Sequence, residues 1–347
     1  MAKVTWIIGN GFDINIGLKT RYTDFYKVYT IVQPGDNAVI QRFKKEILKD
    51  EAYGWQNWAD FEMGFGKQSK QFDGGTAVED FLSCYSDFVK CFHSYLESLS
   101  LSIKWNELNN DMLTAFMNGI SSFSNHITTV QRSIPQAVIH TRDSTGRGIP
   151  VENSFIQFNY TNVFDELLLR CGINSDNNFH VHGALNMNPI IGVDNSTQID
   201  SDVINNDDRV KKIFIKQGYL SLLQKRNVNI PIPAKKALSF IASGDAICVF
   251  GASIGESDLY WWRKVGDRLG NSKCILIIFD VCGQTSDNID PIAVLESELS
   301  IDERRSEIID RFLSLSGLGA DWAEKNENRI IVELDRPVFS FKLPLSP

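Results

Sequence analysis

The sequence predicts an α/β fold, namely a Rossmann-like, mostly parallel sheet with helices on both faces and a large α-helical insertion. Residues 4–8 form a short apolar run that ends at Gly9, as a buried parallel strand does before a turn. Further strand-like runs alternate with helical patterns, which favours a parallel sheet covered on both faces. From about residue 36 the pattern is helical almost throughout. We therefore interpret residues 36–150 as a helical insertion within a single domain, residues 1–347.

Local patterns predict the individual elements. Strand-like runs fall at residues 4–8, 154–158, 179–181, 190–193, 246–250, 274–279 and 329–334. Tyr22, Phe25, Tyr26 and Tyr29 recur at three- and four-residue spacing, which indicates a helix with one aromatic face. Stripes of large apolar residues with the same spacing run through residues 81–99 and 108–127 and indicate two long helices. We interpret these stripes as packing surfaces.

The composition is that of a globular protein. Apolar residues make up 43% of the chain and charged residues 22%, which allows a sizeable core and argues against disorder. The net charge of -8 and the lack of a dense Lys/Arg run disfavour nucleic acid as the main ligand. No stretch approaches the roughly 18 apolar residues of a membrane span, and the first apolar run is too short for a signal peptide. We therefore expect a cytoplasmic protein without membrane contacts.

The cysteines give no sign of a metal site. The six are widely spaced, several lie within apolar runs, and no C-x-x-C pair occurs. We expect reduced, buried thiols and no bound metal.

A glycine-rich loop follows the first predicted strand. It reads Gly9-Asn10-Gly11-Phe12-Asp13 and precedes a predicted helix. Small residues at this place let the backbone approach a phosphate and direct N–H groups at it. A tight turn between a strand and a helix also needs glycines, so both interpretations stay open. The loop lacks the lysine of a Walker-type motif, and Ile14 stands where a third glycine of G-x-G-x-x-G would be.

Polar residues follow two further strands. Asn159 comes directly after the strand at 154–158, where its amide could orient a ribose or a water, or could instead cap a helix. His180 and His182 alternate along a short strand, which would place them on one face. Such a pair suggests a general base near neutral pH, whereas the alternative is two structural histidines.

The loop after the strand at 246–250 is the fourth polar segment. It begins at Gly251 and contains Ser253, Glu256 and Asp258. Their side chains could hold a ribose hydroxyl, while capping of the next helix explains part of the pattern. Because each of the four loops follows a predicted strand, we expect them to converge on one cleft at the carboxyl ends of the strands.

These motifs together resemble the bacteriophage abortive-infection family AbiH. The resemblance spans nearly the whole chain and is carried by residues 8–13, 17–20, 158–161, 180–183 and 251–258. AbiH proteins are similar in turn to the sirtuin-like group, whose glycine-rich loop, asparagine loop and His-Gly element bind NAD. Several phage-defence members of that group destroy NAD.

The resemblance implies roles for individual residues. Asn159 would position the nicotinamide ribose or an attacking water, and His182 would be the general base, with His180 as its substitute. The residues that would contact the nucleotide are Gly9, Asn10, Gly11, Phe12, Asp13, Gly251, Ser253, Glu256 and Asp258. Ala252 stands where a histidine is common in the family, so a role for that side chain is missing here. The zinc-binding cysteines of sirtuin deacetylases have no counterpart, which argues against protein deacetylation.

We therefore expect a phage-defence enzyme that cleaves NAD between nicotinamide and ribose. Asp13 or Asp258 would stabilise the developing ribose cation. The small-molecule partner would be a nucleotide, and regulation would come from a homo-oligomer or a defence partner protein. Two alternatives remain: a nucleotide-binding sensor without catalysis, and a hydrolase or nuclease that acts on another nucleotide.

Overall fold

The computed structural model describes residues 2–127, 135, 150–186, 189–216, 232–280, 291–336 and 338–346. The strands are β1 Ala2–Ile8, β2 Val151–Gln157, β3 Asn178–His180, β4 Ala246–Phe250, β5 Ile275–Asp280 and β6 Ile330–Leu334. The helices before β2 are α1 Gly11–Asn15, α2 Tyr22–Tyr29, α3 Ala38–Lys49, α4 Phe61–Gln68, α5 Ala77–Leu101 and α6 Asn110–Ser121. The later helices are α8 Val163–Arg170, α9 Asp202–Asn206, α10 Asp208–Ile213, α12 Ile232–Ser243, α13 Leu259–Gly270, α14 Pro291–Ser316 and α15 Ala320–Lys325.

The six strands form one parallel sheet in the order β3-β2-β1-β4-β5-β6. This is the strand order of the Rossmann fold, and it confirms the predicted fold class. The crossovers run outward in opposite directions from the central pair, β1 and β4. Ligands of such sheets bind outside the carboxyl ends of the strands, at the point where the direction reverses.

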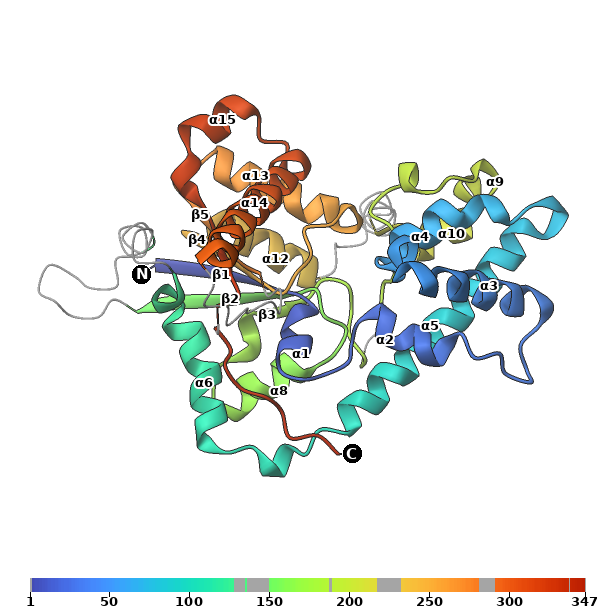
Figure 1. The fold of residues 1–347 in the computed structure, drawn as a ribbon, viewed down its shortest axis with the longest axis horizontal. Helices are drawn as coiled ribbons and strands as arrows, with labels where there is room; N and C mark the ends of the chain where they lie inside the picture. The colour runs from blue at the N-terminus through green and yellow to red at the C-terminus, as the bar shows by residue number, and fades with distance from the viewer. Residues whose placement is uncertain are drawn as a thin grey trace, which may run out of the picture.

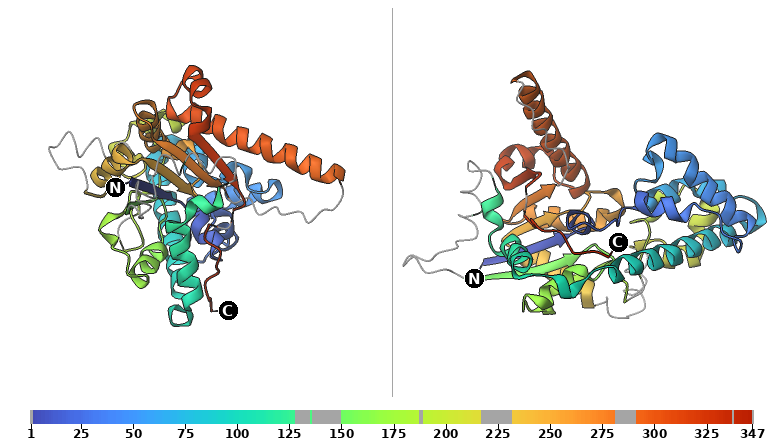
Figure 2. Two further views of the ribbon diagram at one scale, coloured as in Figure 1. Left: turned by 90° about the vertical axis from the view of Figure 1, so that its left-hand side faces the viewer. Right: turned by 60° about the horizontal axis from the view of Figure 1, so that its bottom comes forward.

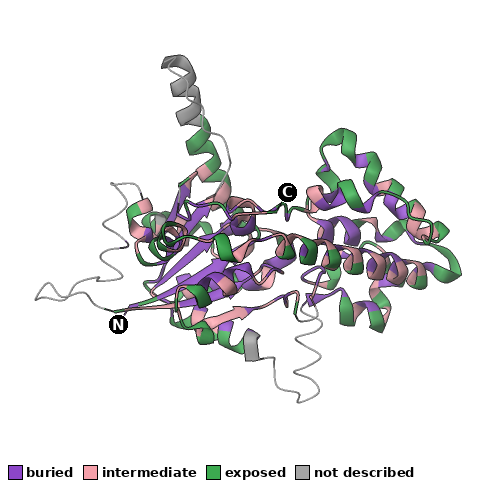
Figure 3. Ribbon diagram, turned by 90° about the horizontal axis from the view of Figure 1, so that it is seen from below, coloured by how far each residue is buried: buried purple, intermediate pink, exposed green. Residues whose placement is uncertain are grey.

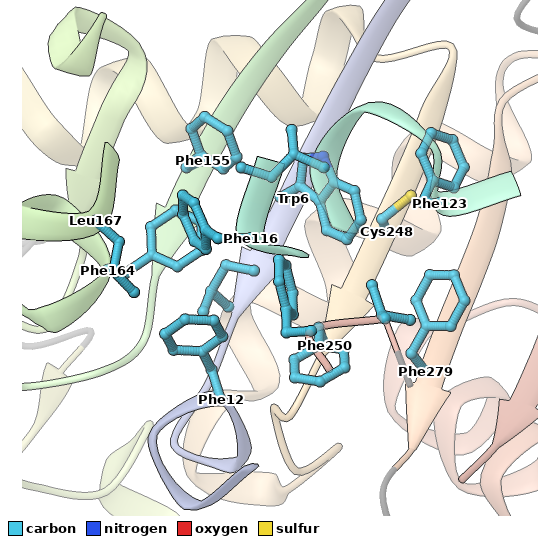
Figure 4. Close-up of a cluster of buried hydrophobic side chains, with 14 of the residues drawn as sticks. Trp6, Phe12, Phe116, Phe123, Phe155, Phe164, Leu167, Cys248, Phe250 and Phe279 are labelled. Atoms are coloured by element: carbon cyan, nitrogen blue, oxygen red, sulfur yellow. The ribbon is translucent and has the colours of Figure 1, made fainter. Parts of the chain in front are cut away.

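Helices cover both faces of the sheet (Figure 1). Alternate residues of each strand supply the two hydrophobic cores, as the period of a strand requires. On one face Trp6, Phe155 and Phe250 pack against α1, α6, α8 and the C-terminal segment, and Figure 4 shows this aromatic cluster. On the other face Ile7, Ile156 and neighbouring strand residues pack against α12, α13 and α14. The strands β1, β4 and β5 are buried along most of their length (Figure 3).

A separate helical body lies beyond the carboxyl ends of the strands (Figures 1 and 2). It consists of α2, α3, α4, α5, α9 and α10 around a third core rich in aromatic rings. The rings of Phe61 and Phe88, for example, stack with centroids 3.4 Å apart. Residues 191–215, which lie outside the predicted insertion, also contribute to this core. Helix α6 lies within the predicted insertion, residues 36–150, but packs on the sheet. Residues 128–134 and 136–149 of that range lie outside the described residues.

One predicted strand is wrong. Residues 190–193 form no strand, and Val193 makes only an isolated bridge to Ile215. This segment is apolar because Ile191 and Val193 are buried in the helical body. The apolar pattern of residues 190–193 therefore indicates that the segment is buried. Burial alone does not show that a segment pairs with the sheet.

Candidate functional site

The loops after β1 and β4 meet at the point where the strand order reverses. The Gly9 N–H donates to the Phe250 carbonyl (3.0 Å), and the Gly11 N–H donates to the Gly251 carbonyl (2.7 Å). A Cβ on Gly9 would lie 2.3 Å from the Cα of Ala252, and one on Gly11 would lie 2.5 Å from the Cα of Gly251. Gly251 itself has φ +67°, a conformation that favours glycine. The glycines are therefore required for the close approach of the two loops.

The side chains of the glycine loop point in three directions. Phe12 is fully buried among Phe116, Phe164 and Phe339, so its ring belongs to the sheet core. Asn10 is exposed and hydrogen bonds through its side chain to Thr20. Asp13 points toward the loop after β2. Phosphate binding by the remaining backbone N–H groups of this loop stays a prediction.

Asp13 connects the loop after β1 to the loop after β2. Its Oδ1 accepts a hydrogen bond from Asn159 Nδ2 (3.3 Å), and its Oδ2 accepts one from Thr161 Oγ1 (2.6 Å). All three residues are buried. Burial raises the pKa of Asp13 from 3.8 to about 7, although the Thr161 hydrogen bond and His180 oppose the rise. Asp13 is thus a carboxyl group that can exchange a proton near neutral pH.

His180 and His182 separate because β3 ends at His180. His180 turns toward α8, where Nε2 lies 2.9 Å from Asp165 Oδ2 and Nδ1 lies 2.9 Å from the Asn159 carbonyl. Both ring nitrogens are thus occupied by protein acceptors. The contact with the carbonyl makes His180 a support for the backbone of Asn159.

His182 lies in a second buried group, beside the loop after β4. Its Nε2 is 2.9 Å from Asp258 Oδ1, and the same oxygen accepts a hydrogen bond from Lys216 Nζ (3.0 Å). The atoms Nε2 and Oδ1 are close but not aligned for a hydrogen bond, so Nε2 is left without a hydrogen-bond partner. Burial, followed by the charge of Lys216, lowers the pKa of His182, and Asp258 opposes this. His182 is therefore neutral at physiological pH.

Glu62 extends this second group into the helical body. Its Oε2 lies 3.3 Å from Lys216 Nζ, and its Oε1 accepts a hydrogen bond from the Tyr160 hydroxyl (3.0 Å). Burial raises the pKa of Glu62 to about 7, and Lys216 opposes the rise. For Asp258, burial alone would raise the pKa, but Lys216 and His182 outweigh it and hold the pKa well below its usual range. Asp258 therefore stays an anion.

Several buried polar side-chain atoms of the described residues have no hydrogen-bond partner. Among the described side chains, the buried atoms without a hydrogen-bond partner are Gln157 Oε1, Asn159 Oδ1, Asn162 Oδ1, His182 Nε2, Asn205 Oδ1 and Trp262 Nε1. Asn159 and His182, both predicted from the sequence as catalytic, are thus two of the residues with an unsatisfied buried atom. Such an atom costs stability unless a water or a ligand contacts it, so Asn159 Oδ1 can accept a hydrogen bond from a bound molecule.

The remaining predicted contacts lie at the rim. Ser253 and Glu256 are exposed in the loop after β4, and the Glu256 carbonyl accepts a hydrogen bond from Gln198. No three His, Cys, Asp or Glu side chains within the described ranges are arranged to hold a metal ion. No helix in the part of the chain that the structure describes is long and apolar enough to cross a membrane.

Sequence reasoning missed four residues of the site. Thr161 and Asp165 lie in or beside the recognised Asn159 motif, and their hydroxyl and carboxyl groups were a usable signal. Glu62 and Lys216 gave no sequence signal, because each is a single charged residue in a segment far along the chain from its partners. Their burial could be recognised only in the folded structure.

The fold and the site define a Rossmann-like α/β protein with buried acid, base and amide groups at the carboxyl edge of its sheet. Residues 5–280 match the family described as Bacteriophage abortive infection AbiH, and the chain belongs to this family. Membership supports a role in bacteriophage abortive infection. No curated protein matches the sequence.

Proposed function

We propose that this AbiH protein hydrolyses NAD, or a closely related nucleotide, and releases nicotinamide during phage defence. The strand order supports this, because it is the order of sheets that bind dinucleotides at their carboxyl edge. The proposal includes the sirtuin-like relationship inferred from the sequence motifs.

The placement of Asn159 and His182 carries the proposal. Both side chains are buried, Asn159 Oδ1 has no hydrogen-bond partner among the described residues, and His182 Nε2 lies 2.9 Å from Asp258 Oδ1. They follow adjacent strands, since β2 pairs with β3 up to Gln157 and His180. An amide oxygen and an imidazole after neighbouring strands suit the binding of a ribose hydroxyl and a water.

His182 is the general base of the proposed reaction. A carboxylate 2.9 Å from Nε2 favours a proton on that nitrogen, which leaves Nδ1 as the basic one. The contact with Asp258 would become an aligned hydrogen bond when substrate binds, as in other catalytic sites whose free form is poorly aligned. This pairing of a carboxylate with a neutral imidazole is the arrangement that activates a nucleophile in hydrolases.

Water attacks the ribose carbon that carries nicotinamide. The bond between that carbon and the ring nitrogen breaks, its electron pair stays on the nitrogen, and nicotinamide leaves as a neutral molecule. His182 takes the proton of the water, and Asn159 orients the water or a ribose hydroxyl. The protein contributes mainly positioning and charge stabilisation of the ribose cation.

Asp13 is better placed than Asp258 to stabilise that cation. Lys216 contacts Asp258 and offsets its charge. Asp13 hydrogen bonds instead to the neutral side chains of Asn159 and Thr161. Its charge is therefore available when it is ionised, above a pH of about 7.

The test is NAD loss with chromatography of the products, for wild type, Asn159→Ala and His182→Ala. Matched controls are Asn174→Ala, which changes an exposed residue before β3, and His126→Ala, which changes a histidine after α6. We expect wild type and both controls to release nicotinamide, and both site variants to lose this activity while remaining folded.

Two outcomes would contradict the proposal. If wild type binds NAD but leaves it intact, even in extract of phage-infected cells, the site is that of a sensor. If another nucleotide is cleaved and NAD is not, the reaction has a different substrate.

A further inference from the structure

A buried ionic cluster joins the helical body to the candidate catalytic edge. It consists of Glu62, Lys216 and Asp258, and all three side chains are at most 12% exposed. Lys216 Nζ lies 3.3 Å from Glu62 Oε2, 3.0 Å from Asp258 Oδ1 and 3.1 Å from the Ser257 carbonyl. An ammonium group has three donors, so these three acceptors account for all of them.

One oxygen of this cluster has two partners. Asp258 Oδ1 faces both Lys216 Nζ, at 3.0 Å, and His182 Nε2, at 2.9 Å. The more strongly Lys216 binds this oxygen, the less of its negative charge acts on the imidazole. In a buried site such a competition has a large effect, because little water screens it.

We infer that Lys216 is a positioning residue for the proposed reaction: it shares the Asp258 oxygen with His182 and thereby keeps the imidazole in the neutral form that can accept a proton. Glu62 regulates this sharing from the other side, because it competes with Asp258 for the same ammonium group. The inference rests on the proposed function for its role in catalysis, but its electrostatic content does not depend on any substrate.

The charged surroundings of His182 support the inference. Lys216 lowers the pKa of His182 and Asp258 raises it, while His180 makes a smaller contribution that lowers it. Glu62 contacts Lys216, and the Tyr160 hydroxyl donates a hydrogen bond to Glu62. Two substitutions in the cluster should therefore act on His182 in opposite directions.

The helical body is part of this arrangement. Glu62 lies on α4 between Phe61 and Met63, and the ring of Phe61 is buried in the core of the helical body. Asp258 and His182 come from loops after β4 and β3. The site is thus complete only when the helical body is packed on the carboxyl edge of the sheet.

The test measures the pKa of His182 by NMR in wild type, Lys216→Met and Glu62→Gln. The chain has five histidines, so the imidazole signals can be assigned by comparison with His182→Ala. Lys264→Met is the matched control, because Lys264 is a half-exposed lysine of α13 paired with Asp267.

In Lys216→Met we expect the pKa of His182 to rise by about 1 or more, as is usual when a neighbouring like charge is removed. In Glu62→Gln we expect the pKa of His182 to fall, because Asp258 is then the one carboxylate left in contact with Lys216. Lys264→Met should leave it unchanged. The acid limb of the rate profile of Lys216→Met should move to higher pH by the same amount, which lowers the rate there about tenfold.

A merely structural role would not produce shifts of opposite sign. If the pKa of His182 stays constant in both variants, or moves the same way in both, the inference is overturned. Should Lys216→Met fail to fold, a rise or no change in Glu62→Gln would still overturn it. The titration needs no NAD, so this failure is distinct from a failure to release nicotinamide, which concerns only the proposed function.

Discussion

Replacement of Asp13 by asparagine should make the stability of the protein less dependent on pH. The folded state raises the pKa of this carboxyl from 3.8 to about 7, chiefly by burial. Between these two values the folded chain binds a proton that the unfolded chain has released, so stability falls as the pH rises. The loss of stability caused by ionising buried Asp13 is absent below about pH 4 and fully present above about pH 7. The substitution Asp13→Asn removes the ionisable group and keeps the shape of the side chain.

The size of the effect follows from the pKa of Asp13. Each pKa unit is worth about 1.4 kcal/mol, so the full penalty at high pH is about 4 kcal/mol. Between pH 5.5 and pH 8 the change is about 2 kcal/mol by the same relation, because part of the penalty is already present at pH 5.5. The advantage of Asp13→Asn over wild type should therefore be about 2 kcal/mol larger at pH 8 than at pH 5.5.

Urea unfolding at the two pH values measures this difference. Any packing change caused by the amide affects both measurements and cancels in the comparison. Asp73→Asn is the control, because Asp73 is exposed on the loop before residues 74–76. If the advantage of Asp13→Asn is the same at both pH values, the carboxyl of Asp13 titrates normally and its assignment as a group that exchanges a proton near neutral pH is wrong.

Two further predictions concern the glycine loop, and urea unfolding checks both. Gly11→Ala should lower the free energy of unfolding by about 1–3 kcal/mol through overpacking, since the new Cβ would lie 2.5 Å from the backbone of Gly251. Gly35→Ala is the control and should be close to neutral, because its Cβ would meet nothing within 4 Å. Equal effects of the two substitutions would contradict the packing argument. Phe12→Ala should cost about 3–5 kcal/mol because its ring is fully buried, whereas Val28→Ala on the exposed side of α2 should change little. A Phe12 variant of wild-type stability would show that the ring is not part of the sheet core.

The local elements could be predicted because their patterns are local. The strands around Trp6 and Cys248 are almost entirely apolar over residues 4–8 and 246–250, and such runs are typical of strands buried on both faces. The prediction failed at residues 190–193, where the apolar run lies in the core of the helical body. An apolar run reports that a segment is buried, and only long-range contacts decide what it is buried against.

The interpretation of the glycines shows the same limit at the level of atoms. From the sequence, Gly9 and Gly11 indicate either a close approach to a phosphate or a tight turn between strand and helix. The neighbour at the Cβ positions is the backbone of Gly251 and Ala252. A sequence shows where a side chain is missing, but it does not show which group uses the space.

The sequence by itself determined that Asn159, His182 and Asp258 lie in polar loops that follow strands. The parallel sheet then placed these loops at one edge, because the carboxyl ends of parallel strands all lie there. The tertiary structure alone decided the pairing of individual groups. It turned His180 toward Asp165, left Asn159 Oδ1 without a hydrogen-bond partner, and placed His182 Nε2 beside Asp258. It also brought Glu62 within reach of Lys216, 154 residues away along the chain. Hydrogen bonds and ion pairs act over a few ångströms, so such pairings depend on how the helical body packs against the sheet and leave no local pattern in the sequence.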